Sequence, residues 1–234
     1  MDVSVIDELP KGRQPITTHT AAQPKRPELI ERLRKILAQG QQAYWVCTLI
    51  EPSEEIEALS AEEAFDLLRR NLPESRVALL HGRMKGDEKV EVMRAFKAGE
   101  YQLLVATTVV EVGVDVPNAT QMFIENAERL GLAQLHQLRG RVGRGSKASR
   151  CFLLFKPGVS QAGQHRLNAL RQSQDGFYLA EQDLKLRGPG DILGTRQSGE
   201  QSFKIADLSE HAHLMPRVVQ RCETMMNAAP ASND

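Results

Sequence analysis

Hydrophobic residues follow two alternating patterns along this chain, short apolar runs and longer amphipathic stretches. Apolar runs of strand length occupy about 43–50, 76–80, 102–107, 121–124 and 151–155. Between them, apolar residues recur every three or four positions, which predicts helices at about 27–39, 60–71, 87–97 and 132–138. Continuous apolar runs are typical of strands covered on both faces. The alternation therefore predicts an α/β fold, an open and mostly parallel sheet with helices on both faces.

The first and last parts of the chain depart from this alternation. Three prolines in the first 25 residues indicate an irregular entry or an edge strand. The second helix is expected to begin at Ser60, because Ser60 and Glu63 form a capping-box pattern. After Lys156 the pattern changes to one amphipathic helix, at about 162–172, followed by glycine-rich segments.

These changes of pattern suggest three parts. We expect a sheet domain at 1–157, a small helical hairpin and loop at 158–214, and a C-terminal segment at 215–234 whose end is disordered.

Composition restricts the class of protein. The chain has 234 residues, of which 41% are hydrophobic and 26% charged, as is usual for a soluble globular protein with a core. No apolar run approaches the ~18 residues that a membrane span needs, and no secretory signal is visible at the N-terminus. The three cysteines, Cys47, Cys151 and Cys222, are too few and too scattered for a disulfide framework or a thiolate zinc site, so we expect a cytoplasmic protein without a metal site.

The net charge of zero conceals an uneven distribution. Residues 129–174 contain nine basic side chains and no acidic one, which leaves 21 of the 30 basic residues against all 30 acidic residues elsewhere. Such a block indicates an anionic partner such as phosphate or nucleic acid. Charge counts alone favour a solvated basic face.

The segment with the clearest chemistry is Q-L-R-G-R-V-G-R-G at 137–145. Arg141 and Arg144 are three residues apart and each follows a glycine, so little bulk separates the two guanidiniums. Arginine donates paired hydrogen bonds to phosphate and keeps its charge. The glycine spacing is not that of a dinucleotide fingerprint. The alternative is an arginine- and glycine-rich surface loop.

A second segment, 106–117, joins the end of a predicted strand to an exit turn. Thr107 and Thr108 end the strand, and Gly113 and Asp115 lie in the turn. Hydroxyl and backbone N–H groups suit a phosphodiester, and a carboxylate suits a ribose hydroxyl. In isolation, Asp115 is more typical of a plain turn than of a sugar ligand.

Together these segments resemble the second RecA-like lobe of superfamily 2 helicases. Residues 43–51, 106–117 and 137–144 resemble helicase motifs IV, V and VI, and the run at 125–137 is similar to the RecG family, with Mfd the nearest relative considered. His81, Gly82 and Arg83 resemble an element that lies near the nucleic-acid backbone in that family.

The tail at 183–199 resembles the translocation motif of the RecG family. The resemblance implies that Arg166, Arg187 and Gln197 hold this motif together and couple nucleotide state to movement. Without the resemblance, 187–199 would be interpreted as a glycine-rich linker.

Two elements of a complete helicase are missing from the sequence. There is no G-x-x-x-x-G-K-[ST] phosphate loop and no acidic motif II in a suitable context. In RecG-like proteins the phosphate loop, motif II and a wedge for branched DNA lie upstream. We therefore expect this chain to be a C-terminal part that is inactive alone, with ATP and Mg²⁺ bound mainly by an N-terminal lobe.

The resemblance implies an ATP-dependent DNA helicase that unwinds or branch-migrates forks and Holliday junctions in recombination and repair, working as a monomer. Arg141 and Arg144 are then arginine fingers, and Gln137 couples nucleotide state to DNA. Gly113 and Asp115 contact the ribose. The residues expected to contact the DNA backbone are His81, Gly82, Arg83, Thr107 and Thr108. The alternatives are a non-catalytic nucleic-acid-binding module, and an enzyme that binds a small phosphorylated ligand at 140–145.

Overall fold

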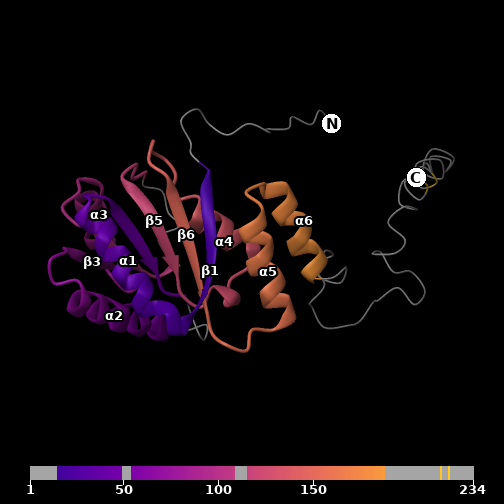
Figure 1. Cartoon of the computed structure of the whole chain (residues 1–234), viewed down its shortest axis with the longest axis horizontal. Helices are drawn as coiled ribbons and strands as arrows, with labels where there is room; N and C mark the ends of the chain where they lie inside the picture. Colours follow the sequence, from indigo (N-terminus) through magenta and orange to yellow (C-terminus); the bar gives the residue numbers. More distant parts are fainter. Residues whose placement is uncertain (1–14, 49–53, 109–114, 188–216, 218–220, 222–234) are drawn as a thin grey trace, which may run out of the picture. The chain divides into compact units, whose positions relative to one another are not determined.

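The computed structural model describes residues 15–48, 54–108, 115–187, 217 and 221. Its centre is a six-stranded sheet in the order β1-β6-β5-β2-β4-β3, and each neighbouring pair is parallel (Figure 1). The strands are β1 Ile16–Ala22, β2 Gln42–Val46, β3 Val77–Leu80, β4 Leu103–Ala106, β5 Ala119–Ile124 and β6 Ser149–Phe155. The helices are α1 Arg26–Ala38, α2 Glu54–Asn71, α3 Gly86–Lys97, α4 Leu132–Arg139, α5 Gln161–Gln172 and α6 Gly176–Arg187, with short 3-10 turns η1 Gln23–Lys25 and η3 Ala127–Arg129. The predicted α/β class is confirmed, and the proline-containing entry contributes the edge strand β1.

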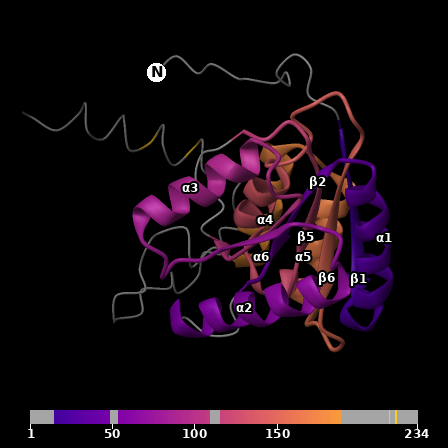
Figure 2. The same ribbon diagram turned by 90° about the vertical axis from the view of Figure 1, so that its left-hand side faces the viewer.

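Both faces of the sheet are covered, as the continuous apolar runs predict. Trp45 of β2 points toward α1 and α2, in one core with Leu33 and Leu68. The next side chain on the strand, Tyr44, points to the other face, where its ring meets Phe96 of α3 edge-on at 5.1 Å. Figure 2 shows helices on both sides of the sheet. Both aromatic side chains of β2 belong to the core, since each is at most 1% exposed.

The predicted start of the second helix is wrong. Helix α2 begins at Glu54, so Ser60 lies inside the helix and does not cap it. Glu, Ile, Ala and Leu fill the six residues before Ser60, and most of these are strong helix formers. Acidic residues also suit the first turn of a helix. The local preference for helix therefore extends the element upstream of the capping pattern.

Two further helices follow the last strand. The side chain of Gln174, just after α5, accepts a 3.0 Å hydrogen bond from the backbone N–H of Ile16 in β1. His165 of α5 and Gln182 of α6 lie within hydrogen-bonding distance at 3.0 Å, so the two helices lie side by side. The chain divides into compact units at Met1–Gln182 and Asp183–Asp234. Within the described part, none of the helices is long and apolar enough to cross a membrane.

Candidate functional site

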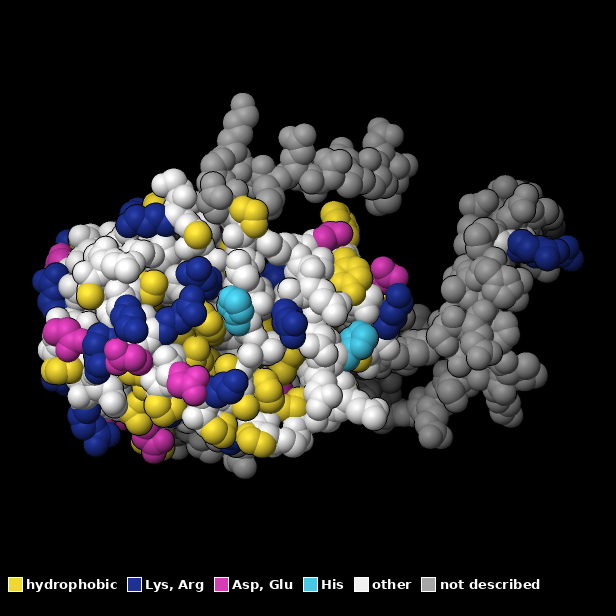
Figure 3. Space-filling view, in the orientation of Figure 1, with side chains coloured by type: hydrophobic (Ala, Val, Ile, Leu, Met, Phe, Trp, Pro, Cys, Tyr) yellow, Lys and Arg dark blue, Asp and Glu magenta, His cyan; other side chains and the backbone are white. Residues whose placement is uncertain are grey.

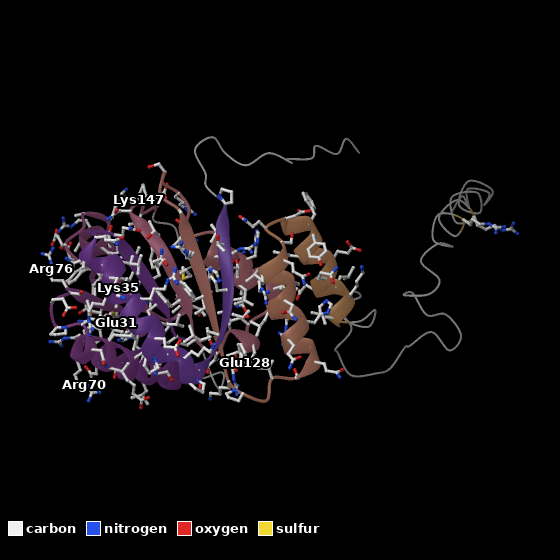
Figure 4. All side chains as sticks on the ribbon, viewed as in Figure 1. Glu31, Lys35, Arg70, Arg76, Glu128 and Lys147 are labelled. Carbon is white, nitrogen blue, oxygen red and sulfur yellow. The ribbon has the colours of Figure 1, made fainter. Side chains whose placement is uncertain are left out.

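The predicted site residues lie at two opposite edges of the sheet. His81 and Thr107 directly follow β3 and β4, so they lie at the edge formed by the carboxyl ends of the strands. Asp115 precedes β5, and the loop 140–148 precedes β6, so both lie at the amino edge. In Figure 4, Lys147 of that loop and Glu128, which follows β5, are labelled at opposite ends of the sheet. We call 140–148 the arginine loop.

At the amino edge, Arg144 connects the arginine loop to the segment before β5. Its Nε donates a 3.1 Å hydrogen bond to the carbonyl of Gly140, and its Nη1 lies 3.5 Å from Oδ1 of Asp115. The Arg144 side chain is 30% exposed and that of Asp115 56% exposed. This pair is partly solvated, so an anionic ligand could reach it.

Arg141 completes the pair of arginines predicted from the sequence. Its half-buried guanidinium has no hydrogen bond or ion pair with the residues that the structure describes. Gln137 is exposed on α4 and is likewise without a described partner, and Gly113 lies outside the described residues. The structure thus brings Arg141, Arg144 and Asp115 together, with unused donors on Arg141.

Two glycines determine the backbone conformation of the arginine loop. Gly143 has a φ of 76°, a conformation that residues with a Cβ rarely adopt. A Cβ on Gly145 would lie 2.5 Å from the carbonyl oxygen of Pro117, so only glycine allows the loop to pack there. Beyond them, Nζ of Lys147 donates to Oδ1 of Asn118 at 3.2 Å. The loop is therefore held against the segment that carries Asp115.

The buried phenol of Tyr44 is close enough to the amino edge to be affected by its charges. Burial raises the pKa of Tyr44 to about 12, while Arg141 and Arg144 act to lower it and Asp115 to raise it. The two arginines and the carboxylate therefore all act on the same buried phenol.

At the carboxyl edge, the buried polar atoms without a partner among the described residues include two that directly follow strands β3 and β4: Nδ1 of His81 and Oγ1 of Thr107. Thr107 is fully buried, and its backbone N–H donates to the carbonyl of Leu80 at 3.1 Å, which holds the ends of β3 and β4 together. The other ring nitrogen of His81 lies 3.8 Å from Glu62. Buried polar groups are nearly always hydrogen-bonded, so these two atoms are candidates for pairing with a further group.

The remaining residues predicted at this edge surround those two atoms. The carbonyl of Gly82 accepts a 2.6 Å hydrogen bond from Nζ of Lys89, which fixes the turn after β3. Arg83 is exposed and Thr108 is half-buried. A basic side chain and a hydroxyl are thus available beside the unpaired atoms.

Glu125, which also follows a strand at this edge, is engaged within the fold. Its Oε1 accepts a 2.6 Å hydrogen bond from the indole of Trp45 and forms an ion pair with Arg26. The hydroxyl of Thr48 donates to the backbone carbonyl of Glu125 at 2.7 Å. A carboxylate this well paired stabilises the junction of β2 and β5 and is not free to bind a ligand.

Of the three residues expected to hold the translocation motif together, one has described side-chain contacts. The guanidinium of Arg166 donates to the carbonyls of Leu130 at 3.2 Å and Glu128 at 3.1 Å, and so ties α5 to the turn after β5. Arg187 ends α6, but its side chain lies outside the description, as does all of Gln197. Their predicted interaction stays a prediction.

One buried residue of the arginine segment was not identified from the sequence. Arg139 is 2% exposed and hydrogen-bonds to groups in β1 and at the C-terminal end of α5. The signal was present, because Leu132, Leu135 and Arg139 are spaced by three and four residues and therefore lie on one helix face. A charged residue at an otherwise apolar position of that face indicates a buried, fully paired guanidinium.

Comparison with known proteins gives a consistent result for both parts of the chain. Residues 28–146, just over half of the chain, match the helicase conserved C-terminal domain family. Residues 173–234 match the family described as ATP-dependent DNA helicase RecG, domain 3, C-terminal. The chain is 58% identical over 219 residues to the ATP-dependent DNA helicase RecG of Escherichia coli O157:H7, covering 93% of this chain and 32% of the relative.

A second relative and a solved structure agree with this match. The chain is 51% identical to the RecG helicase of Haemophilus influenzae over 98% of its own length and 33% of the relative. It is also similar to a solved structure of RecG bound to a three-way DNA junction, with a TM-score of 0.69 and 42% identity over 89% of this chain and 27% of that one. The chain thus spans about a third of the length of the curated relatives it matches.

Proposed function

The chain belongs to the helicase conserved C-terminal domain family and is RecG-like, and from this premise we propose that it forms the second lobe of an ATP-dependent DNA helicase. ATP would bind between the amino edge of this sheet and an N-terminal lobe that supplies the phosphate loop. The substrate would be branched DNA, forks and Holliday junctions, in recombination and repair. Support for branched DNA comes from the similarity to RecG bound to a three-way junction. We propose that the helicase works as a monomer in the cytoplasm.

The observation that carries this proposal is the guanidinium pair at the amino edge. Arg141 has unused donors among the described residues, and Arg144 lies beside it with one weak ion pair to Asp115. A guanidinium donates two parallel hydrogen bonds to phosphate oxygens. We propose that both arginines stabilise the charge that develops on the transferring γ-phosphoryl group, as arginine fingers do.

Asp115 and its neighbours would position the nucleotide. In our proposal the carboxylate of Asp115 accepts a hydrogen bond from the ribose, next to Gly113, once Arg144 turns to the phosphate. Gln137 lies on α4, which leads into the arginine loop, and would relay nucleotide state toward DNA.

ATP supplies the phosphoanhydride bond, and Mg²⁺ neutralises phosphate charge. In the part of the chain that the structure describes, no group of three His, Cys, Asp or Glu side chains could hold a metal ion. We propose that the N-terminal lobe, which would carry the phosphate loop and motif II, holds Mg²⁺ and most of the ATP. This chain contributes cations and a ribose contact.

The carboxyl edge would bind the DNA backbone. Thr107 and His81 each present a buried polar atom without a described partner, and a phosphodiester offers both acceptor oxygens and compensating charge. Thr108, Gly82 and Arg83 would complete this contact. Movement along DNA would then depend on the 158–214 segment, through Arg166, Arg187 and Gln197.

The test is ATP hydrolysis by the complete helicase on a three-way junction. Arg141→Ala and Arg144→Ala should each lower turnover by about 10³-fold, the scale of a lost arginine finger. The matched control is Arg70→Ala, which removes an exposed arginine of α2 labelled in Figure 4 and should leave turnover unchanged. The melting temperature should barely change in all three variants, because each arginine is partly solvated.

The same measurement separates this proposal from a non-catalytic binding module. The 234-residue chain alone should bind DNA but hydrolyse ATP only at background. Near-normal turnover in both arginine variants, or DNA-stimulated turnover by the purified chain alone, would show that the nucleotide site is not shared in this way.

A further inference from the structure

Arg139 carries a charge into the interior of the protein without an acidic partner in the part of the chain that the structure describes. The residue is 2% exposed, and it forms no salt bridge with the residues that the structure describes. Burying a charge is costly unless hydrogen bonds replace its water. The oxygens around Arg139 must therefore provide that compensation.

Most of this compensation comes from the end of α5. Nη1 of Arg139 donates to the carbonyl of Leu170 at 2.6 Å and to that of Ser173 at 2.8 Å, with a longer contact of 3.4 Å to Oγ1 of Thr18 in β1. The last carbonyls of a helix lack partners within the helix and carry partial negative charge. The guanidinium therefore caps α5 at its C-terminus.

A second contact extends the link to the start of α6. Nη2 of Arg139 lies 2.9 Å from Nδ1 of His136. A guanidinium can only donate, so Nδ1 is the acceptor in this contact. The other ring nitrogen, Nε2, faces Gly176, where a Cβ would lie 3.5 Å away. The last turn of α4 therefore touches the hairpin at the end of α5 and at the start of α6.

On its other side, Arg139 continues directly into the arginine loop. It is the last residue of α4, and the backbone N–H of Val142 donates to its carbonyl at 3.3 Å. The N–H of Arg141 donates to the carbonyl of Leu138 at 3.0 Å. A displacement of Arg141 is thus passed to Arg139 through a tight turn with little freedom to absorb it.

We propose that Arg139 is a positioning residue that transmits movement of the arginine loop to the α5–α6 hairpin. This inference rests on the proposed function. The planar fork of arginine donates in several directions at once, and breaking any of these bonds leaves a buried charge or carbonyl unsatisfied. The link is therefore stiff, and α5 follows α4 when a nucleotide draws in Arg141 and Arg144. Arg139 itself contacts neither nucleotide nor DNA.

The test compares Arg139→Lys with a matched core variant in the complete helicase. Lysine keeps the charge but lacks the fork, so ATP turnover on a three-way junction should stay close to normal. Base pairs unwound per ATP should fall by about tenfold, within the usual range of coupling between linked sites. The control is Leu33→Ala, in the core on the α1 side of the sheet. The two variants are assayed at temperatures at which they have the same stability, and Leu33→Ala should keep the normal number of base pairs unwound per ATP.

A second readout uses hydrogen exchange in the 234-residue chain. The amide of Ser173, which donates to the carbonyl of Ala169 at 3.1 Å, should exchange faster in Arg139→Lys and at the normal rate in Leu33→Ala. Unchanged exchange at Ser173 would mean that Arg139 does not hold this end of α5, and would overturn the inference.

The outcomes also separate this inference from the proposed function. If Arg139→Lys lowers turnover and unwinding in parallel, Arg139 is only structural, and the inference fails while the proposed function stands. If the unmodified helicase shows no junction-stimulated turnover, the proposed function fails and the inference fails with it.

Discussion

Two sets of predicted site residues, one at each edge of the sheet, differ in their burial. At the amino edge, Arg141, Arg144 and Asp115 are charged and partly exposed, with one 3.5 Å ion pair between them. At the carboxyl edge, the hydroxyl of Thr107 and Nδ1 of His81 are buried and have no partner among the described residues. Water can solvate the first set, so it costs the fold little. The second set costs stability until another group pairs with it.

This difference follows from the connections between parallel strands. In open α/β sheets, ligands usually lie at the carboxyl ends of the strands. Helix α4 begins after β5 and leads back to the start of β6, so it brings the arginine loop to the opposite edge. A lobe with polar groups at both edges can bind two ligands without competition between them.

Substituting Gly145 should disturb the amino edge alone. In Gly145→Ala the new Cβ would lie 2.5 Å from a backbone oxygen of Pro117, so the arginine loop must shift. A displacement of about 1 Å costs catalysis about 10²-fold, which is the expected fall in ATP turnover. DNA affinity without nucleotide should stay normal. The control is Gly86→Ala, where a Cβ meets nothing within 4 Å.

If Gly145→Ala weakened DNA binding as much as ATP turnover, the two edges of the sheet would not act separately and would form one site. Equal turnover in the Gly145 and Gly86 variants would show that the position of the loop has no bearing on hydrolysis.

Substituting Thr107 should affect the carboxyl edge in two opposite ways. Thr107→Val removes a buried hydroxyl without a described partner, so the 234-residue chain should gain about 1 kcal/mol of stability. Calorimetry should show a rise in Tm of about 2–4 °C. DNA affinity of the complete helicase should fall by about tenfold, because a charge-assisted hydrogen bond to phosphate is lost.

The matched control makes the same chemical change where the hydroxyl is paired. Thr48→Val removes hydrogen bonds to the backbone carbonyls of Glu125 and Asn126, so it should lower Tm. A fall in Tm for Thr107→Val as well would mean that the Thr107 hydroxyl is satisfied in the free chain.

The smallest effect is expected at Tyr44, which reports on the charges of the amino edge. The pKa of Tyr44 is raised to about 12, first by burial, so the unfolded chain loses this proton at lower pH than the folded one. Stability should therefore fall as pH rises from about 10 through 12, and Tyr44→Phe should remove that part of the loss.

Ultraviolet titration of Tyr44 then tests the charges directly. Arg141→Ala should raise the pKa of Tyr44 further, and Asp115→Asn should lower it. Carboxyl-edge substitutions such as Arg83→Ala should leave it unchanged. A response to Arg83→Ala would mean that the two edges are not electrostatically separate.

Much of the fold could be predicted from the sequence, because strands and helices follow local patterns of apolar residues. The runs that became β2 to β6 are short and continuous, and the helices between them repeat every three or four residues. The start of α2 was missed because a local cap pattern at Ser60 competed with helix-forming residues upstream. Residue types suggested the candidate site, since paired arginines and strand-end hydroxyls suit phosphate in any fold, and the roles of these residues stay predictions.

The sequence alone therefore determined the fold class and most of the elements, and it suggested the residues that we propose to bind phosphate. Only the tertiary structure decided which residues lie side by side along each edge, because that depends on strand order and on the course of the connections. It alone buried Arg139 against Thr18, 121 residues away, and left Thr107 without a described partner. Such contacts join segments far apart in the chain, and no local pattern of side chains encodes them.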